Sequence, residues 1–173
     1  MSDYIIWDER LAGSRPRQYM SLNVNESTKL TDAVKYAVMR AGFNHGKLDR
    51  LFLMAHGIED NGRGGYGLLF CAEELTHLTV HMLAPLHKKV NKIVLLACSA
   101  AALADEKSKG GDGDGDFLCR RMAKITGAWV RASTYEQEYY DTKVGNDFGD
   151  WEGDCWWFSP DGKTKLKADL KTY

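Results

Sequence analysis

The 173-residue sequence predicts an α/β protein with an open, mostly parallel sheet flanked by helices. The segments RLFLMA (50–55) and KIVLLA (92–97) are continuous apolar runs, which are typical of strands covered on both faces. Apolar positions spaced three and four residues apart indicate a helix at 30–41, before the first run, and a second helix is expected at 117–126, after the second run. This alternation of helices and strands predicts parallel strands joined by crossovers.

The other elements follow from shorter signals. No internal repeat and no linker divides the chain, so residues 1–173 are interpreted as one domain, with 1–27 as a poorly patterned N-terminal segment. The further expected elements are short strands at 4–7 and 19–24, an antiparallel ribbon or extra strand within 62–76, a helix over 75–86 that bends or ends near Pro85, a strand at 128–134 and a turn at 160–162.

The two main helices have recognisable end signals. Polar residues that can accept a hydrogen bond precede each helix, and a glycine follows each one. The expected cap and end are Ser27 or Thr28 and Gly42 for the first helix, and Asp116 and Gly127 for the second.

Composition excludes several classes of protein. The formal net charge is -1, so no basic excess favours nucleic-acid binding. The apolar runs are far shorter than the roughly 20 residues of a membrane-spanning helix. The first residues lack the apolar core of a secretory signal, and we expect a cytoplasmic protein without a membrane partner. The thiols expected to be reduced are Cys71, Cys98, Cys119 and Cys155.

One histidine and one cysteine each follow a predicted core strand. His56 comes directly after the first apolar run, and Cys98 directly after the second. The carboxyl ends of parallel strands lie on one edge of a sheet, and neighbouring strands are about 5 Å apart, so we expect the two side chains to share a cleft. A second His-Gly pair at His45 precedes the first strand and is expected at the opposite edge, as a turn.

This pairing suits thiol chemistry. A thiol becomes a useful nucleophile when a base such as histidine stands beside it. Gly57 allows close approach of the backbone, and its N–H and that of Cys98 are candidate donors to a developing oxyanion. The ordinary alternatives are a buried cysteine that packs as a small hydrophobe and a histidine hydrogen-bonded at a strand end.

The pattern resembles the clan of caspase-like cysteine peptidases, which includes caspases, legumains, gingipains, separases and bacterial CHAT-type domains. An apolar strand ends in His-Gly, and about forty residues later an apolar strand ends in Ala-Cys. The segment FLCRRMAKITGAWVRAST is similar to the helix and strand that follow the cysteine in CHAT-like members, and GDWEGDCWWFSPDGK is similar to their closing strand. The resemblance covers roughly residues 49–163.

The resemblance implies a three-layer sandwich and a cysteine endopeptidase that cuts a protein or peptide through a thioester, without metal or cofactor. Cys98 matches the nucleophile, His56 the general base and acid, and Gly57 an oxyanion donor. Leu96 stands where caspases have a glutamine, so a preference for aspartate is in doubt. The candidate substrate contacts are Ala132, Ser133, Thr134 and Arg131. Arg131 could bind an acidic side chain of the substrate, but we favour the alternative that it is a surface arginine.

Two other functions remain open at this point: an inert binding or regulatory module of the same fold, and a different thiol reaction such as deamidation or acyl transfer. An activating or targeting partner and the oligomeric state are also open. The glycine-rich loop at 105–116 is interpreted as an acidic loop whose last residue caps a helix, with calcium binding or processing as alternatives. His77 and His81 have a metal-compatible spacing but no third ligand.

Overall fold

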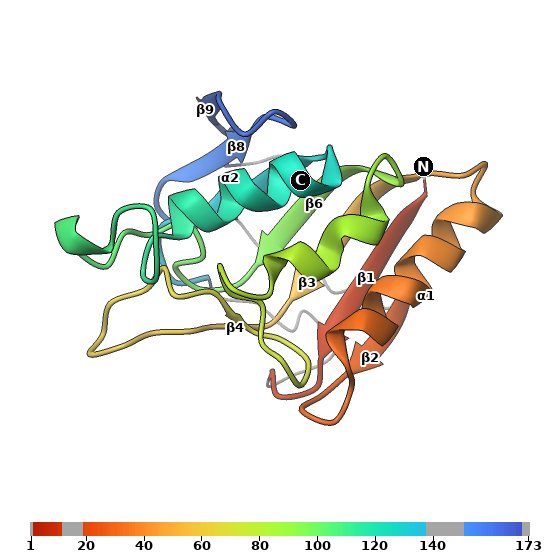
Figure 1. Ribbon diagram of the computed structural model, residues 1–173, viewed down its shortest axis with the longest axis horizontal. Coiled ribbons are helices and arrows are strands. Elements are labelled where there is room, and N and C mark those ends of the chain that lie inside the picture. The colour runs from red at the N-terminus through yellow and green to blue at the C-terminus, as the bar shows by residue number, and fades with distance from the viewer. Residues whose placement is uncertain (1, 12–18, 138–150, 171–173) are drawn as a thin grey trace.

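The structure, a computed structural model, describes residues 2–11, 19–137 and 151–170. Strands and helices alternate along most of this chain (Figure 1). The elements are β1 (Asp3–Asp8), β2 (Met20–Val24), α1 (Leu30–Phe43), β3 (Leu48–Met54), β4 (His56–Gly57), β5 (Leu68–Leu69), the 3₁₀ helix η1 (Val80–Leu86), β6 (Val90–Leu96), the 3₁₀ helix η2 (Glu106–Ser108), α2 (Gly115–Thr126), β7 (Trp129–Ser133), β8 (Cys155–Phe158) and β9 (Lys165–Lys167).

Seven of the strands form one sheet in the order β2-β1-β3-β6-β7-β8-β9. The first five strands in this order, β2, β1, β3, β6 and β7, are parallel to one another. β8 and β9 follow at one edge of the sheet, and each is antiparallel to the strand before it. The α/β prediction of an open, mostly parallel sheet is therefore confirmed. The short strands β4 and β5 form a separate antiparallel pair. β5 lies within the predicted segment 62–76, whereas its partner β4 lies before that segment.

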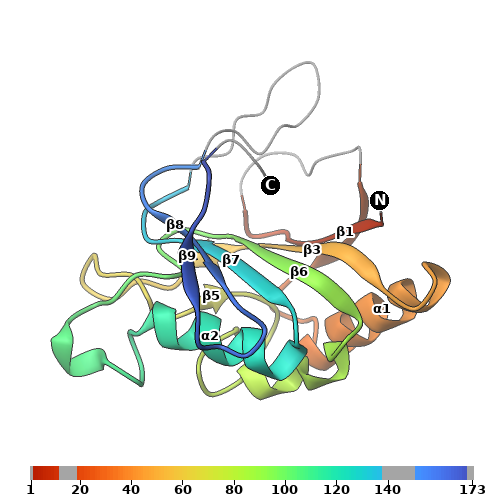
Figure 2. The ribbon, with the colours of Figure 1, turned by 90° about the horizontal axis from the view of Figure 1, so that it is seen from above.

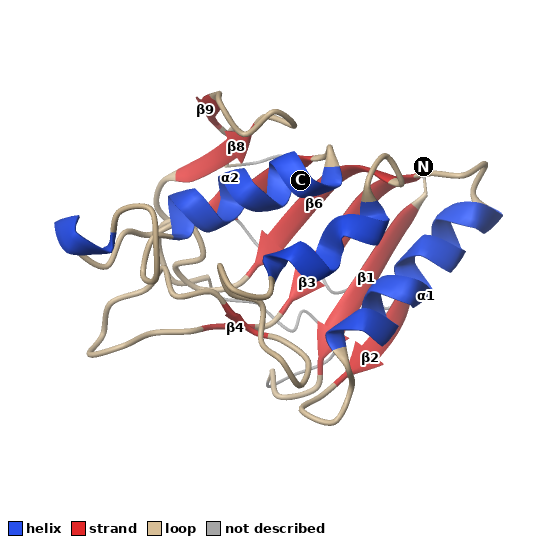
Figure 3. Cartoon of the chain, in the orientation of Figure 1, coloured by secondary structure: helices blue, strands red, loops and turns tan. Residues whose placement is uncertain are grey.

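The helices α1, η1 and α2 cover the same face of the sheet (Figures 2 and 3). η1 lies between α1 and α2 and packs against both. Within the described residues, the opposite face has no helix. Its cover consists of loop residues that include Leu11, Tyr19 and Trp151.

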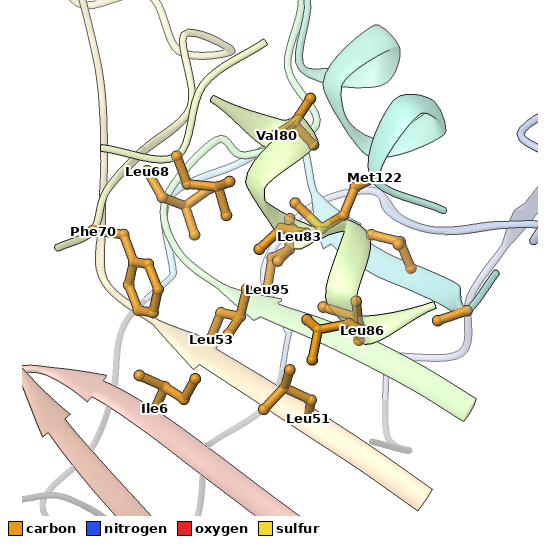
Figure 4. Packing of buried hydrophobic residues seen from close by; sticks show 14 of the residues in the cluster. Ile6, Leu51, Leu53, Leu68, Phe70, Val80, Leu83, Leu86, Leu95 and Met122 are labelled. Carbon is orange, nitrogen blue, oxygen red and sulfur yellow. The ribbon is translucent and has the colours of Figure 1, made fainter. Parts of the chain in front are cut away.

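Successive side chains of the central strands point alternately to the helical face and to the opposite face of the sheet. Leu51 and Leu53 of β3 point to the helical face, where they pack near Leu86 of η1 (Figure 4). Phe52 and Met54 belong to the cluster on the opposite face. Side chains alternate along a strand, so a strand buried on both faces must be apolar at every position, which explains the uninterrupted run at 51–54.

The predicted ends of the first helix are wrong. Neither Ser27 nor Thr28 caps α1; the Leu30 N–H donates instead to Glu73 Oε2 at 2.7 Å. This acceptor comes from a segment more than forty residues later, so no local pattern could reveal it. Gly42 lies inside the helix, which continues for one residue beyond it.

The predicted cap of the second helix is wrong by two residues. Asp114, not Asp116, is the N-terminal cap of α2, and its Oδ1 accepts the Phe117 N–H at 2.9 Å. Asp116 lies in the first helical turn, where it pairs with Arg120 and Lys165. The end at Gly127 is confirmed, and this glycine has a left-handed backbone with φ 65°.

The helix expected over 75–86 is shorter and tighter than its pattern indicates. Only η1 forms, a 3₁₀ helix that begins at Val80 and ends one residue after Pro85, in line with the predicted end near this proline. His77 therefore lies outside the helix that contains His81, and the two do not share a helical face. No helix in the described ranges has both the length and the apolar character needed to cross a membrane.

Candidate active site

The two predicted catalytic residues leave the sheet on the same edge. β3 and β6 are neighbouring parallel strands, paired up to Met54 and Leu96. The ladder continues one step further, since the Ala55 N–H donates to Leu96 O at 3.3 Å. His56 and Cys98 follow directly, and Figure 1 places β4 at the carboxyl ends of these strands. His45 lies before β3 in a turn with φ 56°, as expected.

Gly57 lies in direct contact with Cys98. A Cβ atom added to Gly57 would overlap the Cys98 carbonyl oxygen and stand 3.3 Å from Cys98 Cβ. Only glycine therefore allows the two segments to approach this closely. The His-Gly and Ala-Cys pieces, which are about forty residues apart in sequence, are therefore in contact in the fold.

The Cys98 thiol is half-buried and lies against the backbone of Gln137. The Gln137 N–H donates to Cys98 Sγ at 3.4 Å, and Gln137 O is 3.8 Å from the same sulfur. An N–H donor interacts more strongly with a thiolate than with a neutral thiol. Within the described residues, the Cys98 N–H donates to no backbone acceptor.

His56 is exposed, and among the described residues its ring has one hydrogen-bond partner. Its Nε2 lies 3.1 Å from the carbonyl oxygen of Arg10, which follows β1. A carbonyl oxygen can only accept, so in the neutral ring Nε2 carries the proton and Nδ1 has the free lone pair. This is the tautomer in which Nδ1 can take a proton.

The glycine-rich segment before β5 covers the turn that follows Cys98. Ser99, the residue after Cys98, has a left-handed backbone with φ 50°. A Cβ atom on Gly64 would overlap the Ser99 side chain, and one on Gly65 would overlap the Ala102 carbonyl oxygen. Sequence reasoning assigned these glycines only to the ribbon or extra strand within 62–76, although their density in GRGGYG indicated a close approach of two backbones.

Three of the four predicted substrate contacts are completely buried. Arg131, Ala132 and Ser133 have no exposed side-chain surface, so a substrate at the surface can reach none of these side chains in this structure. Ser133 O accepts the Ala101 N–H at 2.8 Å. Thr134 is the exception, because it is only half-buried and its role stays a prediction.

The expectation that Arg131 is a surface residue is wrong. Its Nε donates to Cys155 Sγ at 3.2 Å, and its Nη2 donates to Asp169 O. The guanidinium carbon lies 4.5 Å from the ring centre of Trp151 and 5.5 Å from that of Trp157. A guanidinium stacks on aromatic rings and is more weakly hydrated than an ammonium, so arginine is better suited than lysine to this interior position.

A cavity of about 560 Å³ opens beside the turn after Cys98. Its lining includes Thr134, Leu103 and Phe117, together with the ion-paired Asp116, Arg120 and Lys165. Thr134 thus lies in the wall of this cavity, and its substrate contact stays a prediction.

The other three cysteines differ from Cys98 in their surroundings. Cys71, Cys119 and Cys155 are buried, and all four thiols are free. Burial raises the pKa of Cys71 to about 12, and the nearby Asp8 adds to this shift. Burial likewise raises the pKa of Cys119 and of Cys155. Cys98 is thus the thiol that a reagent in solution reaches most readily.

The aspartates of the 105–116 loop serve local structure. Asp105 accepts the N–H groups of Lys107 and Ser108, and Asp114 caps α2. The part of the chain that the structure describes contains no group of three histidine, cysteine, aspartate or glutamate residues able to hold a metal ion.

Comparison with family models, with curated proteins and with solved structures finds no match of any of the three kinds.

Proposed function

We propose that the protein is a cysteine endopeptidase with a His56–Cys98 dyad, similar to the caspase-like clan. The observation that supports this best is the contact of Gly57 with Cys98, which sets the residue after the base directly against the nucleophile. The defined bond from His56 Nε2 to Arg10 O adds to it, because it leaves Nδ1 as the basic nitrogen.

The proposed reaction proceeds in two steps. Cys98 Sγ attacks the carbonyl carbon of a peptide bond while His56 Nδ1 takes the thiol proton. The N–H groups of Cys98 and Gly57 stabilise the oxyanion, and His56 returns the proton to the leaving amine. A water molecule, deprotonated by His56, then hydrolyses the thioester and releases the acid and the thiol.

The same dyad is compatible with deamidation or acyl transfer, and the same fold with an inert module. A peptide library incubated with the protein and analysed by mass spectrometry separates these functions. Cleaved peptides support the endopeptidase, deamidated or transferred products support the second class, and an unchanged library with an unreactive Cys98 supports the inert module.

His56→Ala is expected to lower the alkylation rate of Cys98 by iodoacetamide at pH 7 about 30-fold. The reason is that the thiolate, not the thiol, reacts with iodoacetamide, and without His56 no base stands beside Cys98 to take the thiol proton. The measurement is the labelling rate of each cysteine by peptide mass spectrometry.

His45→Ala is the matched control, because His45-Gly46 is the other His-Gly pair and lies at the opposite end of β3. Faster labelling of Cys98 than of the three buried cysteines is not sufficient, since burial alone produces it. Equal Cys98 rates in the wild type and in His56→Ala would contradict the dyad.

A further inference from the structure

Asp8 is a fully buried carboxylate at the carboxyl end of β1, next to the site. Its Oδ1 accepts from Arg10 Nε at 2.7 Å and from the Arg10 backbone N–H at 3.1 Å. Its Oδ2 accepts from Arg10 Nη2 at 2.6 Å and from the Cys71 N–H at 3.1 Å. Four donors thus surround one carboxylate.

These bonds keep Asp8 charged. Burial would raise the pKa of the Asp8 carboxyl, but the hydrogen bonds and charge of Arg10, with the Cys71 N–H, outweigh it and hold that pKa below its usual value. The Arg10 guanidinium also donates to Cys71 O at 3.1 Å. The Asp8–Arg10 pair is therefore fixed to the segment that follows β5.

Arg10 is bound to Asp8 and is also the hydrogen-bond partner of His56. Both the side chain and the backbone N–H of Arg10 are bound to Asp8, and the carbonyl oxygen of the same residue lies 3.1 Å from His56 Nε2. The Leu11 N–H closes the turn on Asp8 O at 3.0 Å. His56 is exposed, so packing does little to fix its ring, and this hydrogen bond is what orients it.

We infer that Asp8 is a positioning residue for the dyad, acting on His56 through the Arg10 carbonyl. Its effect on reactivity rests on the proposed function, because it requires that His56 activates Cys98. A fixed carbonyl partner keeps the proton on Nε2 and Nδ1 free to act as the base. Loss of the Asp8–Arg10 hydrogen bonds leaves the Arg10 peptide mobile and His56 disordered.

A second ion pair on the same strand provides a matched control. Asp3, at the other end of β1, binds Arg50 through both carboxylate oxygens, as Asp8 binds Arg10. Asp3 is also largely buried. Asp3→Asn therefore removes a comparable pair from the same strand at the edge of the sheet remote from Cys98.

The test is a double-mutant cycle on the alkylation rate of Cys98 at pH 7. Asp8→Asn is expected to lower the rate about 5-fold in the wild-type background, less than loss of His56 itself. In the His56→Ala background the same change is expected to have no effect. Asp3→Asn is expected to change neither rate, and thermal unfolding of each variant records the stability lost.

The outcomes separate the two claims. A His56→Ala effect without an Asp8→Asn effect overturns the role of Asp8 alone, whereas no His56→Ala effect overturns the dyad and this role with it. An Asp8→Asn effect of equal size in the His56→Ala background means a general structural disturbance and overturns the role. Where Asp8→Asn does not fold, Arg10→Lys decides by the same cycle, since Arg10 is partly exposed and lysine cannot bind both carboxylate oxygens side by side.

Discussion

Gly57→Ala is expected to lower the kcat/KM of peptide cleavage by about 10²- to 10³-fold. The new methyl group overlaps the Cys98 carbonyl oxygen, a backbone atom that cannot rotate away as a side chain does. The His56-Gly57 segment must then move off Cys98, which displaces both the proposed base and a proposed oxyanion donor. A displacement of about 1 Å costs about 10²-fold in rate, and loss of one oxyanion donor costs about 10²- to 10³-fold.

The measurement is cleavage of a peptide taken from the library, with Cys98→Ala as the inactive reference. Gly42→Ala is the control: Gly42 lies in α1 with no atom within 4 Å of an added Cβ. That change is expected to leave cleavage unaltered and to stabilise the helix by about 0.5–1 kcal/mol. A folded Gly57→Ala protein that cleaves within 3-fold of the wild type would contradict the proposed role of the contact.

The order of the core elements could be predicted because it depends on local patterns. The apolar runs of β3 and β6 directly report burial on both faces, and the parallel pairing follows from the helices between strands. This parallel pairing was enough to predict that His56 and Cys98 lie at the same edge of the sheet. The proposed chemistry at that edge rests on His56 and Cys98, which follow these two strands, and it stays a prediction.

The groups that orient the site could not be predicted because they come from elsewhere in the chain. Arg10 O reaches His56 from the turn after β1, and the Gln137 N–H reaches Cys98 from the segment after β7. Both are backbone groups, which every residue possesses, so no residue type marks them. The Glu73 carboxylate at the start of α1 is a side-chain group, but it too comes from a distant segment of the chain.

Arg131 was misjudged for a different reason. An arginine within a strand is ordinarily at the surface, because burying a charge costs free energy. Here Trp151 and Trp157 lie against the guanidinium, and Asp169 O and Cys155 Sγ accept from it. The partners belong to the last part of the chain, beyond β7, and only the folded arrangement brings them to β7.

Arg131→Ala is expected to lower the free energy of unfolding by about 3–5 kcal/mol, because it leaves a cavity under Trp151 and removes charge-assisted bonds in a buried site. Arg131→Met fills most of the space and is expected to cost about half as much, since replacing a buried charge by an apolar group also removes its desolvation cost. The measurement is equilibrium unfolding in denaturant.

Arg63→Ala is the control for this prediction. Arg63 is an exposed arginine whose Nη1 lies 3.4 Å from Asp105 Oδ2, and its replacement is expected to lower the free energy of unfolding by less than about 1 kcal/mol. If Arg131→Ala costs no more than Arg63→Ala, the buried arginine does not hold β8 and the chain after it against β7, and the aromatic rings alone account for that face of the sheet.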